Sequence, residues 1–258
     1  MPKAKRSLTR LSRLAHRYLG IFAAAQLLLW TSSGLFFSCN AIGSVRGTPE
    51  RAPACALVAP SSASPGKPLA SPSLAIAALV ATKPDARVLS VTLRPLGRGS
   101  VYVLRYRRGD KGSARFALAR SDSGALRSPL SRDEAIDVAR RDFAPSAAVR
   151  DVERITQRSR GSEFRGKSLP LYGVRFDHPR KTRIYVSATR AKVVARRNAQ
   201  WRWFDWFWML HTMDYRDRDD FNTWWLQALA LLGLVTVLSG LALFVATNSW
   251  LRRRRRPQ

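Results

Sequence analysis

Two long apolar segments, one near each end of the 258-residue chain, most strongly limit how it can fold. Residues 18–37 and residues 224–246 contain no formally charged side chain. A helix needs roughly 20 apolar residues to cross the hydrocarbon core of a bilayer, which is about 30 Å thick. A helix also satisfies its own backbone hydrogen bonds in lipid. Both segments are therefore predicted to be transmembrane helices.

The first apolar segment could also be the core of a signal peptide. Such cores run roughly 7–15 residues, and residues 18–37 are longer. Cys39 follows Phe36, Phe37 and Ser38, which match a lipoprotein processing site poorly. We therefore favour an uncleaved membrane anchor over a cleaved leader.

Basic residues flank both apolar segments on the sides that face the chain ends. The first segment is preceded by Lys3, Lys5, Arg6, Arg10, Arg13 and Arg17, and the second is followed by Arg252–Arg256. Lys and Arg beside a membrane helix stay in the cytoplasm. Residues 1–17 and 247–258 are therefore expected to be cytoplasmic. Residues 38 to about 222 should form a large periplasmic region of a two-pass protein in a bacterial inner membrane.

The chain carries 45 Lys and Arg against 17 Asp and Glu, a net charge of +28. Such an excess would ordinarily suggest nucleic-acid binding. Here the basic residues are spread along the chain and are interrupted by the two apolar segments. We therefore expect the lipid bilayer, and no nucleic acid, as a partner.

Residues 38–68 are predicted to form a linker that contains both cysteines. Residues 46–68 are rich in Pro, Ser, Ala and Gly, which is typical of a linker. Cys39 and Cys55 would lie in the oxidising compartment, where a disulfide closing so short a loop typically contributes about 3 kcal/mol. We favour this bridge, and the alternative is two unpaired thiols.

After the linker the chain repeats itself with an offset of sixty residues, giving one copy over residues 69–128 and another over 129–198. Each copy opens with a helix start. Ser71 can cap a helix that has Pro72 at its first position, and Ser131 with Glu134 can form a capping box. These signals predict helices near 72–81 and 131–143.

Runs of β-branched and aromatic residues, bounded by turn residues, follow each predicted helix. In the first copy they cover residues 88–93, 101–106 and 115–118, and in the second copy 149–156, 171–176 and 183–186. Each copy is predicted to be one helix on a three- or four-stranded antiparallel sheet. The expected fold class is a membrane-anchored α+β protein.

The order of these motifs resembles the PepSY domain and its membrane-associated relatives. The second copy carries the S-x-x-E-A-I-x-x-A pattern from Ser131 to Ala139, and His16–Gly20 reads H-R-Y-L-G. The segment Trp208–Tyr215, followed by Phe221 and Asn222, is similar to the one that precedes the family's last helix. The chain departs from the family pattern at Thr189-Arg190-Ala191, in the terminal turn of the second copy.

The resemblance implies a tandem PepSY-like periplasmic domain that acts as a binding or regulatory module on a periplasmic partner, such as a peptidase. Larger PepSY-type membrane proteins are similar to ferric or siderophore-iron reductases that carry haem on histidines. The resemblance therefore also implies a haem-dependent oxidoreductase with a ferric substrate, and leaves open whether the protein is an enzyme.

Residues 199–223 form an aromatic segment just before the second apolar stretch. Because Trp and Tyr prefer the membrane–water boundary, we expect Trp201–Leu210 to be an amphipathic helix at that interface, with Asp205 paired to Arg202. The expected interfacial residues are Trp201, Trp203, Trp206, Trp208, Trp224 and Trp225.

The sequence contains no G-x-S-x-G, H-E-x-x-H, C-x-x-C or glycine-rich phosphate motif, which argues against a hydrolase and predicts no metal site. His178 is read as a turn residue. His16 and His211 lie at opposite ends of the membrane region, separated by about 30 Å. One chain therefore cannot bring both to one haem b, although a parallel homodimer could pair either histidine with its copy. The alternative for each histidine is a plain interfacial residue.

Overall fold

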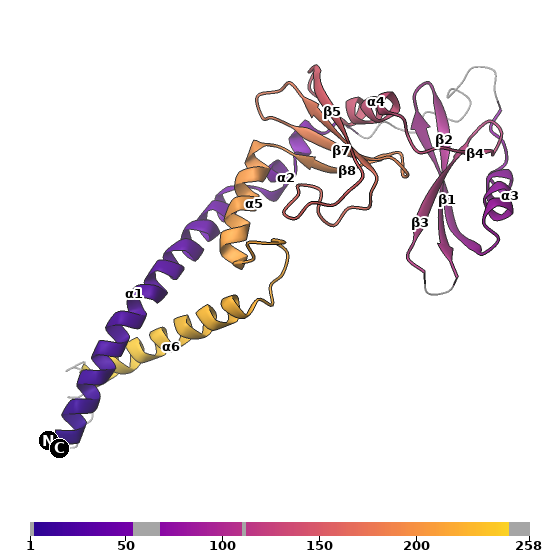
Figure 1. Cartoon of the computed structure of the whole chain (residues 1–258). Helices are drawn as coiled ribbons and strands as arrows, with labels where there is room; N and C mark the ends of the chain where they lie inside the picture. Colours follow the sequence, from indigo (N-terminus) through magenta and orange to yellow (C-terminus); the bar gives the residue numbers. More distant parts are fainter. Residues whose placement is uncertain (1–2, 54–67, 110–111, 248–258) are drawn as a thin grey trace, which may run out of the picture. The chain divides into compact units, whose positions relative to one another are not determined.

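The computed structural model describes residues 3–53, 68–109 and 112–247, which fall into two compact units (Figure 1). The helical unit contains the chain up to Ala41 and again from Trp203 onward. The sheet unit contains Ile42–Arg202. Each unit is described by itself below.

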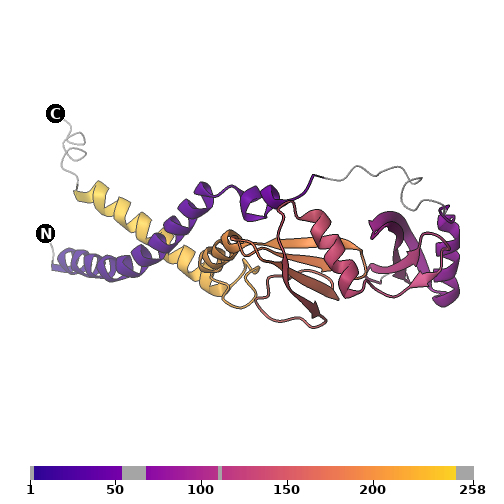
Figure 2. The ribbon, with the colours of Figure 1, turned by 90° about the horizontal axis from the view of Figure 1, so that it is seen from above.

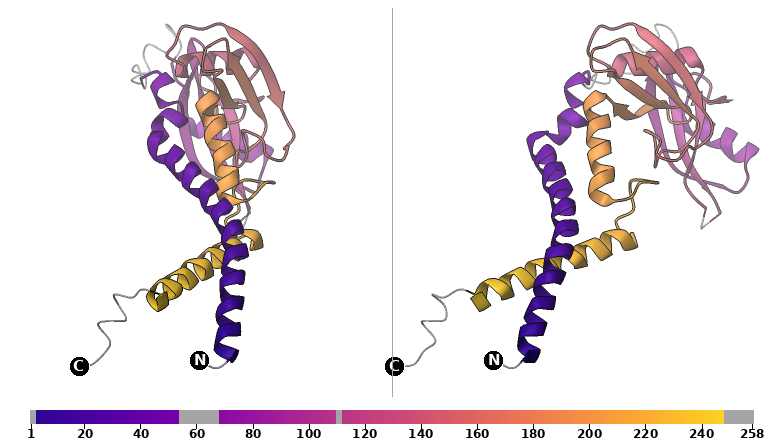
Figure 3. Two further views of the ribbon diagram at one scale, coloured as in Figure 1. Left: turned by 90° about the vertical axis from the view of Figure 1, so that its left-hand side faces the viewer. Right: turned by 60° about the vertical axis from the view of Figure 1, so that its left-hand side comes forward.

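The helical unit contains α1 (Lys3–Cys39), α6 (Trp224–Thr247) and the larger part of α5 (Ala199–Thr212). Helices α1 and α6 contact and cross each other (Figure 3). Within them, His16–Cys39 and Trp224–Val245 are long and apolar enough to cross a membrane. Many of their large apolar side chains are exposed, among them Phe22, Leu28, Leu35, Leu231, Leu241 and Phe244.

The first half of the sheet unit is one helix on a four-stranded antiparallel sheet of order β1-β2-β3-β4. Its elements are α3 (Pro72–Thr82), β1 (Ala86–Leu96), β2 (Gly99–Arg108), β3 (Arg115–Arg120) and β4 (Leu126–Arg127). As predicted, Ser71 caps α3 by accepting a hydrogen bond from the backbone N–H of Ser73, and Pro72 occupies the first turn. Ala75 and Leu79 of α3 are fully buried against this sheet.

The second half repeats this arrangement with sheet order β5-β6-β7-β8, and α4 packs on its strands (Figure 2). Its elements are α4 (Arg132–Asp142), β5 (Val149–Ile155), β6 (Leu171–Phe176), β7 (Arg183–Ser187) and β8 (Lys192–Arg197). The predicted capping box is present: Ser131 Oγ accepts from the Glu134 N–H at 3.2 Å, and Glu134 Oε2 accepts from the Ser131 N–H at 2.9 Å. The predicted α+β class with two antiparallel sheets is confirmed.

The two halves share a core. Leu96, Val101 and Leu118 of the first sheet are buried in the same apolar cluster as Ala135 and Ala139 of α4. This cluster lies on the face of the first sheet that points away from α3, because residues on that face alternate with those in the α3 cluster. Each half therefore buries apolar surface that it could not bury alone.

The linker predicted over residues 38–68 is folded in its first part. Helix α2 (Ile42–Val45) and a 3₁₀ turn, η1 (Thr48–Glu50), precede a short bridge between Arg51 and Phe143. The Ala52 N–H donates to the Asp142 carbonyl at 2.8 Å. Glu50 is only 4% exposed. A carboxylate buried this deeply needs partners, so this stretch belongs to the sheet unit.

The structure does not test the predicted disulfide between Cys39 and Cys55. Cys39, the last residue of α1, is exposed. Cys55 lies outside the described residues. Pairing of the two cysteines therefore stays a prediction.

Candidate functional site

His211, in the last turn of α5, is joined to the C-terminal part of α1 by hydrogen bonds. Its Nδ1 lies 2.8 Å from Ser33 Oγ, and its carbonyl accepts from Trp30 Nε1 at 3.1 Å. Ser33 is fully buried. The imidazole also meets the ring of Phe37 edge-on, with centroids 5.6 Å apart.

His16 makes a similar contact on the opposite half of α1. Its Nδ1 lies 2.7 Å from Ser239 Oγ of α6. Gly240 follows Ser239, and a Cβ there would lie 3.6 Å from His16 Cε1, so the ring packs closely on the α6 backbone. Both candidate histidines are thus held by a serine of another helix.

Each of these serines also lies within hydrogen-bond distance of a carbonyl of its own helix. Ser33 Oγ is 2.9 Å from the Trp30 carbonyl oxygen, and Ser239 Oγ is 2.8 Å from the Thr236 carbonyl oxygen. A hydroxyl has one proton and two acceptor lone pairs, so each serine can donate to the carbonyl and accept from Nδ1–H, or donate to Nδ1. Either arrangement keeps the imidazole against the serine of the neighbouring helix.

The structure does not bring the two histidines together. His16 and Ser33, the residue bonded to His211, are separated by seventeen positions on one helix. At a rise of about 1.5 Å per residue, this is about 25 Å. One chain therefore offers a single histidine near each end of the apolar span His16–Cys39, which is half of the pair of histidines that would hold a haem. His178 is half-buried at the turn before β7 and meets the Phe143 ring edge-on.

The helix predicted over Trp201–Leu210 is present as part of α5, but the tryptophans of the aromatic segment differ in their surroundings. Trp203, Trp206, Trp224 and Trp225 are exposed. Trp208 donates from Nε1 to the Arg218 carbonyl at 3.0 Å. The tryptophans predicted to lie at the interface therefore divide into exposed rings and rings that pack within the protein.

Trp201 is the most enclosed of these rings. It is 8% exposed, and the Arg197 guanidinium lies 4.1 Å from its ring centroid. Its surroundings within the sheet unit are cationic, which suits a cation–π contact. This ring is packed within the protein, and its place at the membrane boundary stays a prediction.

The ion pair predicted between Asp205 and Arg202 is wrong. Asp205, which is 3% exposed, pairs with Arg218 of the loop after α5. Arg202 pairs instead with Glu163, Nε to Oε1, at 2.6 Å. The loops that supply both partners lie outside the helix, so helical spacing alone could not reveal them.

The loop between α5 and α6 is organised by Asp214. Its carboxylate accepts backbone N–H bonds from residues 216, 217, 219 and 220, at 3.0–3.1 Å. Burial raises the pKa of Asp214, but the four N–H donors outweigh burial, and the pKa lies below its ordinary value. An Asp side chain commonly accepts backbone hydrogen bonds in a turn, so Asp214, two residues after the end of α5, could have indicated the loop from the sequence.

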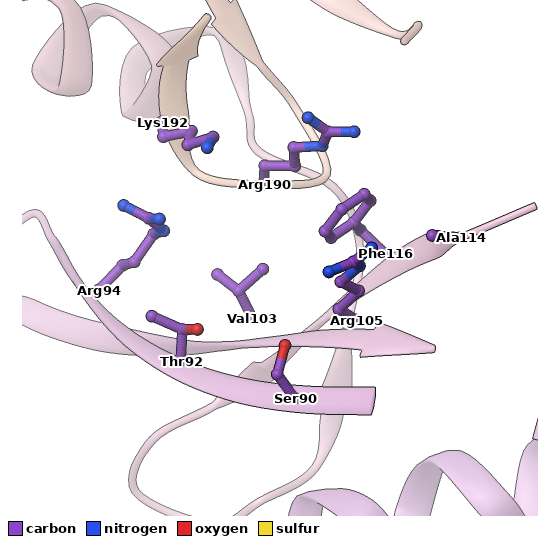
Figure 4. A pocket seen from close by; sticks show the side chains of 9 residues that line it. All are labelled: Ser90, Thr92, Arg94, Val103, Arg105, Ala114, Phe116, Arg190 and Lys192. Atoms are coloured by element: carbon purple, nitrogen blue, oxygen red, sulfur yellow. The ribbon is translucent and has the colours of Figure 1, made fainter. Parts of the chain in front are cut away.

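A second site, which the sequence analysis missed, is a pocket of about 370 Å³ in the sheet unit (Figure 4). We call it the basic pocket. It is lined by Ser90, Thr92, Arg94, Val103, Arg105, Ala114, Phe116, Arg190 and Lys192. Strands β1, β2 and β3 supply its floor, the β7–β8 turn supplies Arg190, and the first residue of β8 supplies Lys192. None of these lining residues is acidic.

Burial and mutual repulsion both act on the cations of the basic pocket. Burial lowers the pKa of the Arg94 guanidinium. Burial, and then the charges of Arg94 and Arg190, lower the pKa of Lys192. The Nε atoms of Arg94 and Arg190 are buried with no hydrogen-bond partner among the described residues. Arg190 also lies over the Phe116 ring, 4.1 Å from its centroid.

A signal for the basic pocket was present in the sequence. Ser90, Thr92 and Arg94 alternate with Val91 and Leu93, so β1 has one polar and one apolar face. Such a polar face usually points to water. Here it is half enclosed by the β7–β8 turn, which no local pattern could show.

Among the described residues, no group of three or more His, Cys, Asp or Glu side chains is placed to hold a metal ion. Comparison with known proteins finds no family model, no curated protein and no solved structure that matches the chain.

Proposed function

We propose that the chain is a two-pass protein of the bacterial inner membrane whose sheet unit is a PepSY-like binding or regulatory module on the periplasmic side. The partner that the sequence resemblance implies is a periplasmic protein such as a peptidase. The observation that carries the proposal is the exposed apolar surface of α1 and α6, joined to a separate unit built from two helix-on-sheet halves.

The apolar surface supports a lipid environment for the helical unit. Phe22 is 69% exposed, Leu28 is 70% exposed and Leu241 is 56% exposed. Water-facing surfaces rarely carry so large a continuous apolar area. Among the described residues, His16 and Ser239 form a side-chain hydrogen bond between the two long helices, a type of contact that joins helices in membranes.

The basic flanks predict the orientation. Alkaline phosphatase fused after Pro68 should be active, because the enzyme needs the oxidising periplasm. Fused after Arg256 it should be inactive. The two fusions control for each other, provided that both accumulate to equal amounts on immunoblots. The reverse pattern of activities would contradict the proposal.

A second candidate function, a haem-dependent oxidoreductase acting as a dimer, is favoured by the serine contacts of the two histidines. Histidines that bind metals have their other ring nitrogen held by a hydrogen-bond partner, and Nδ1 of His16 and of His211 each lies within hydrogen-bond distance of a serine hydroxyl. His16 or His211, together with the same residue of a second chain, would hold the haem. A haem held there would supply single-electron transfer to a ferric substrate.

An absorption spectrum distinguishes the two candidates. If His211 binds haem, protein purified from haem-replete cells should show a Soret band that is lost in His211→Ala and kept in His178→Ala, the control outside the helical unit. A band lost only in His16→Ala would move the haem to the other end of α1. Protein without a Soret band would contradict the oxidoreductase candidate and leave the binding module.

A further inference from the structure

We propose that the basic pocket binds a small molecule that carries two or more phosphate or carboxylate groups. The inference rests on the proposed function only in treating the sheet unit as a binding module, and it names that module's ligand class.

The cations of the basic pocket come from separate elements and converge on one space. Figure 4 shows Arg190 and Lys192 on the β7–β8 side, across from Arg94 and Arg105 of the first sheet, with Val103 between them. A guanidinium offers a planar fork of donors that matches a carboxylate or a phosphate. The hydroxyls of Ser90 and Thr92 add neutral donors to the same wall. An anion in this space would therefore meet donors from two sides.

The charges in the basic pocket contrast with the rest of the sheet unit. Elsewhere, arginines with limited exposure are paired with acids: Arg127 with Glu134, Arg180 with Glu50, Arg196 with Asp142 and Arg202 with Glu163. In the basic pocket, four cations face one another and none of the described lining residues neutralises them. Like charges held together repel, and an anion between them removes that repulsion.

Arg190 is held in place before any ligand arrives. Its guanidinium lies over the Phe116 ring, and its Nη2 is 3.4 Å from Ser168 Oγ. A side chain that is already positioned loses less conformational entropy when it binds. The turn that carries Arg190 is also fixed, since Ala191 adopts a left-handed conformation with φ of 46° and is 5% exposed.

The size of the basic pocket favours a small ligand over an acidic protein segment. Its volume of about 370 Å³ lies near the lower end of the range of roughly 300–1,000 Å³ that is typical of small-molecule sites. With four cations in that volume, one monovalent anion would leave most of the repulsion in place. A compact ligand with several negative groups is the better complement.

The test uses the full-length protein in an uncharged detergent, titrated by calorimetry with pyrophosphate and, separately, with citrate at constant ionic strength. The wild type should bind at least one of them. The double variant Arg94→Gln, Lys192→Gln should bind at least about tenfold more weakly, because each lost charge-assisted hydrogen bond is worth about a factor of ten. Preference for pyrophosphate or for citrate identifies phosphate or carboxylate as the natural group.

The matched control is Arg115→Gln, Arg154→Gln, which removes the same charge from exposed positions on β3 and β5. It should bind within about twofold of the wild type. Both double variants should melt no lower than the wild type, which shows that the sheet unit is folded.

Three results would overturn the inference: no binding by the wild type at millimolar anion, equal weakening in both double variants, or tighter binding of a hexaglutamate peptide than of either small anion. None of these results bears on the alkaline phosphatase fusions, so the membrane arrangement is judged separately.

Discussion

Replacing Arg180 with methionine is expected to lower the free energy of unfolding of the sheet unit by about 1.5–3 kcal/mol, because it removes a charge-assisted hydrogen bond from a buried carboxylate, while the Arg180 side chain itself is 37% exposed. Glu50 is 4% exposed and receives Arg180 Nη1 at 3.1 Å and Thr182 Oγ1 at 2.6 Å. Methionine keeps most of the side-chain volume but leaves the Glu50 carboxylate buried without its counter-charge. That loss, rather than a cavity, causes the expected effect.

Thermal unfolding of the full-length protein in detergent measures the change. A unit of this size should lose roughly 2–4 °C of Tm for each kcal/mol. Adding Glu50→Gln to the Arg180→Met variant should restore part of the stability, because the buried charge is then gone. Arg108→Met is the matched control: the Arg108 and Asp85 side chains are 51% and 72% exposed, and such pairs contribute about 0–1 kcal/mol. Equal losses in the two methionine variants would contradict the prediction.

Replacing Asp214 with alanine is expected to unfold the loop between α5 and α6 locally. The carboxylate is the shared acceptor of four backbone N–H groups, and hydrogen bonds to a charged group contribute about 1.5–3 kcal/mol. Trypsin should therefore cut after Arg216 or Arg218 at least about tenfold faster than in the wild type. Asp217→Ala, at an exposed position of the same loop, should leave the rate unchanged. Equal cleavage of both variants would contradict the role of Asp214.

The Asp214 interaction should also depend on pH. The pKa of the folded group lies below its ordinary value, because four N–H donors outweigh the effect of burial. A carboxylate with a lowered pKa adds stability above the unfolded pKa of about 3.9 and loses it as the pH falls through the folded value. Protection of the amides of residues 216–220 from hydrogen exchange should be constant above about pH 4.5 and should fall only in more acidic solution. A loss of protection near neutral pH would point to a different group.

Local chemistry predicted the secondary structure of the sheet unit well. Ser71 with Pro72, and Ser131 with Glu134, start α3 and α4 at the predicted places. These caps act within one turn of helix, so four residues of sequence contain all the information needed. The alternation of β-branched and polar residues placed the main strands for the same reason. Strands β4 and β8 were missed, because β4 has two residues and β8 carries three basic side chains.

Contacts between distant residues could not be predicted in this way. Glu50 is buried only because Arg180 and Thr182, about 130 positions later, reach it. Arg202 and Asp205 are neighbours on one helix, yet each pairs with a residue of a different loop. The basic pocket forms because Arg190 and Lys192 lie opposite cations of the first sheet. The sequence contains 45 Lys and Arg, and nothing in the composition distinguishes the four that line the pocket from the others.

The two histidine contacts hold α1 from two directions. His16 and Ser33 are seventeen positions apart on α1, and at about 100° per residue they point about 100° away from each other around the helix axis. One contact joins α1 to α6 and the other joins it to α5. A roll of α1 about its axis, or a slide along it, would therefore strain both hydrogen bonds at once. We expect α1, α5 and α6 to move together for this reason.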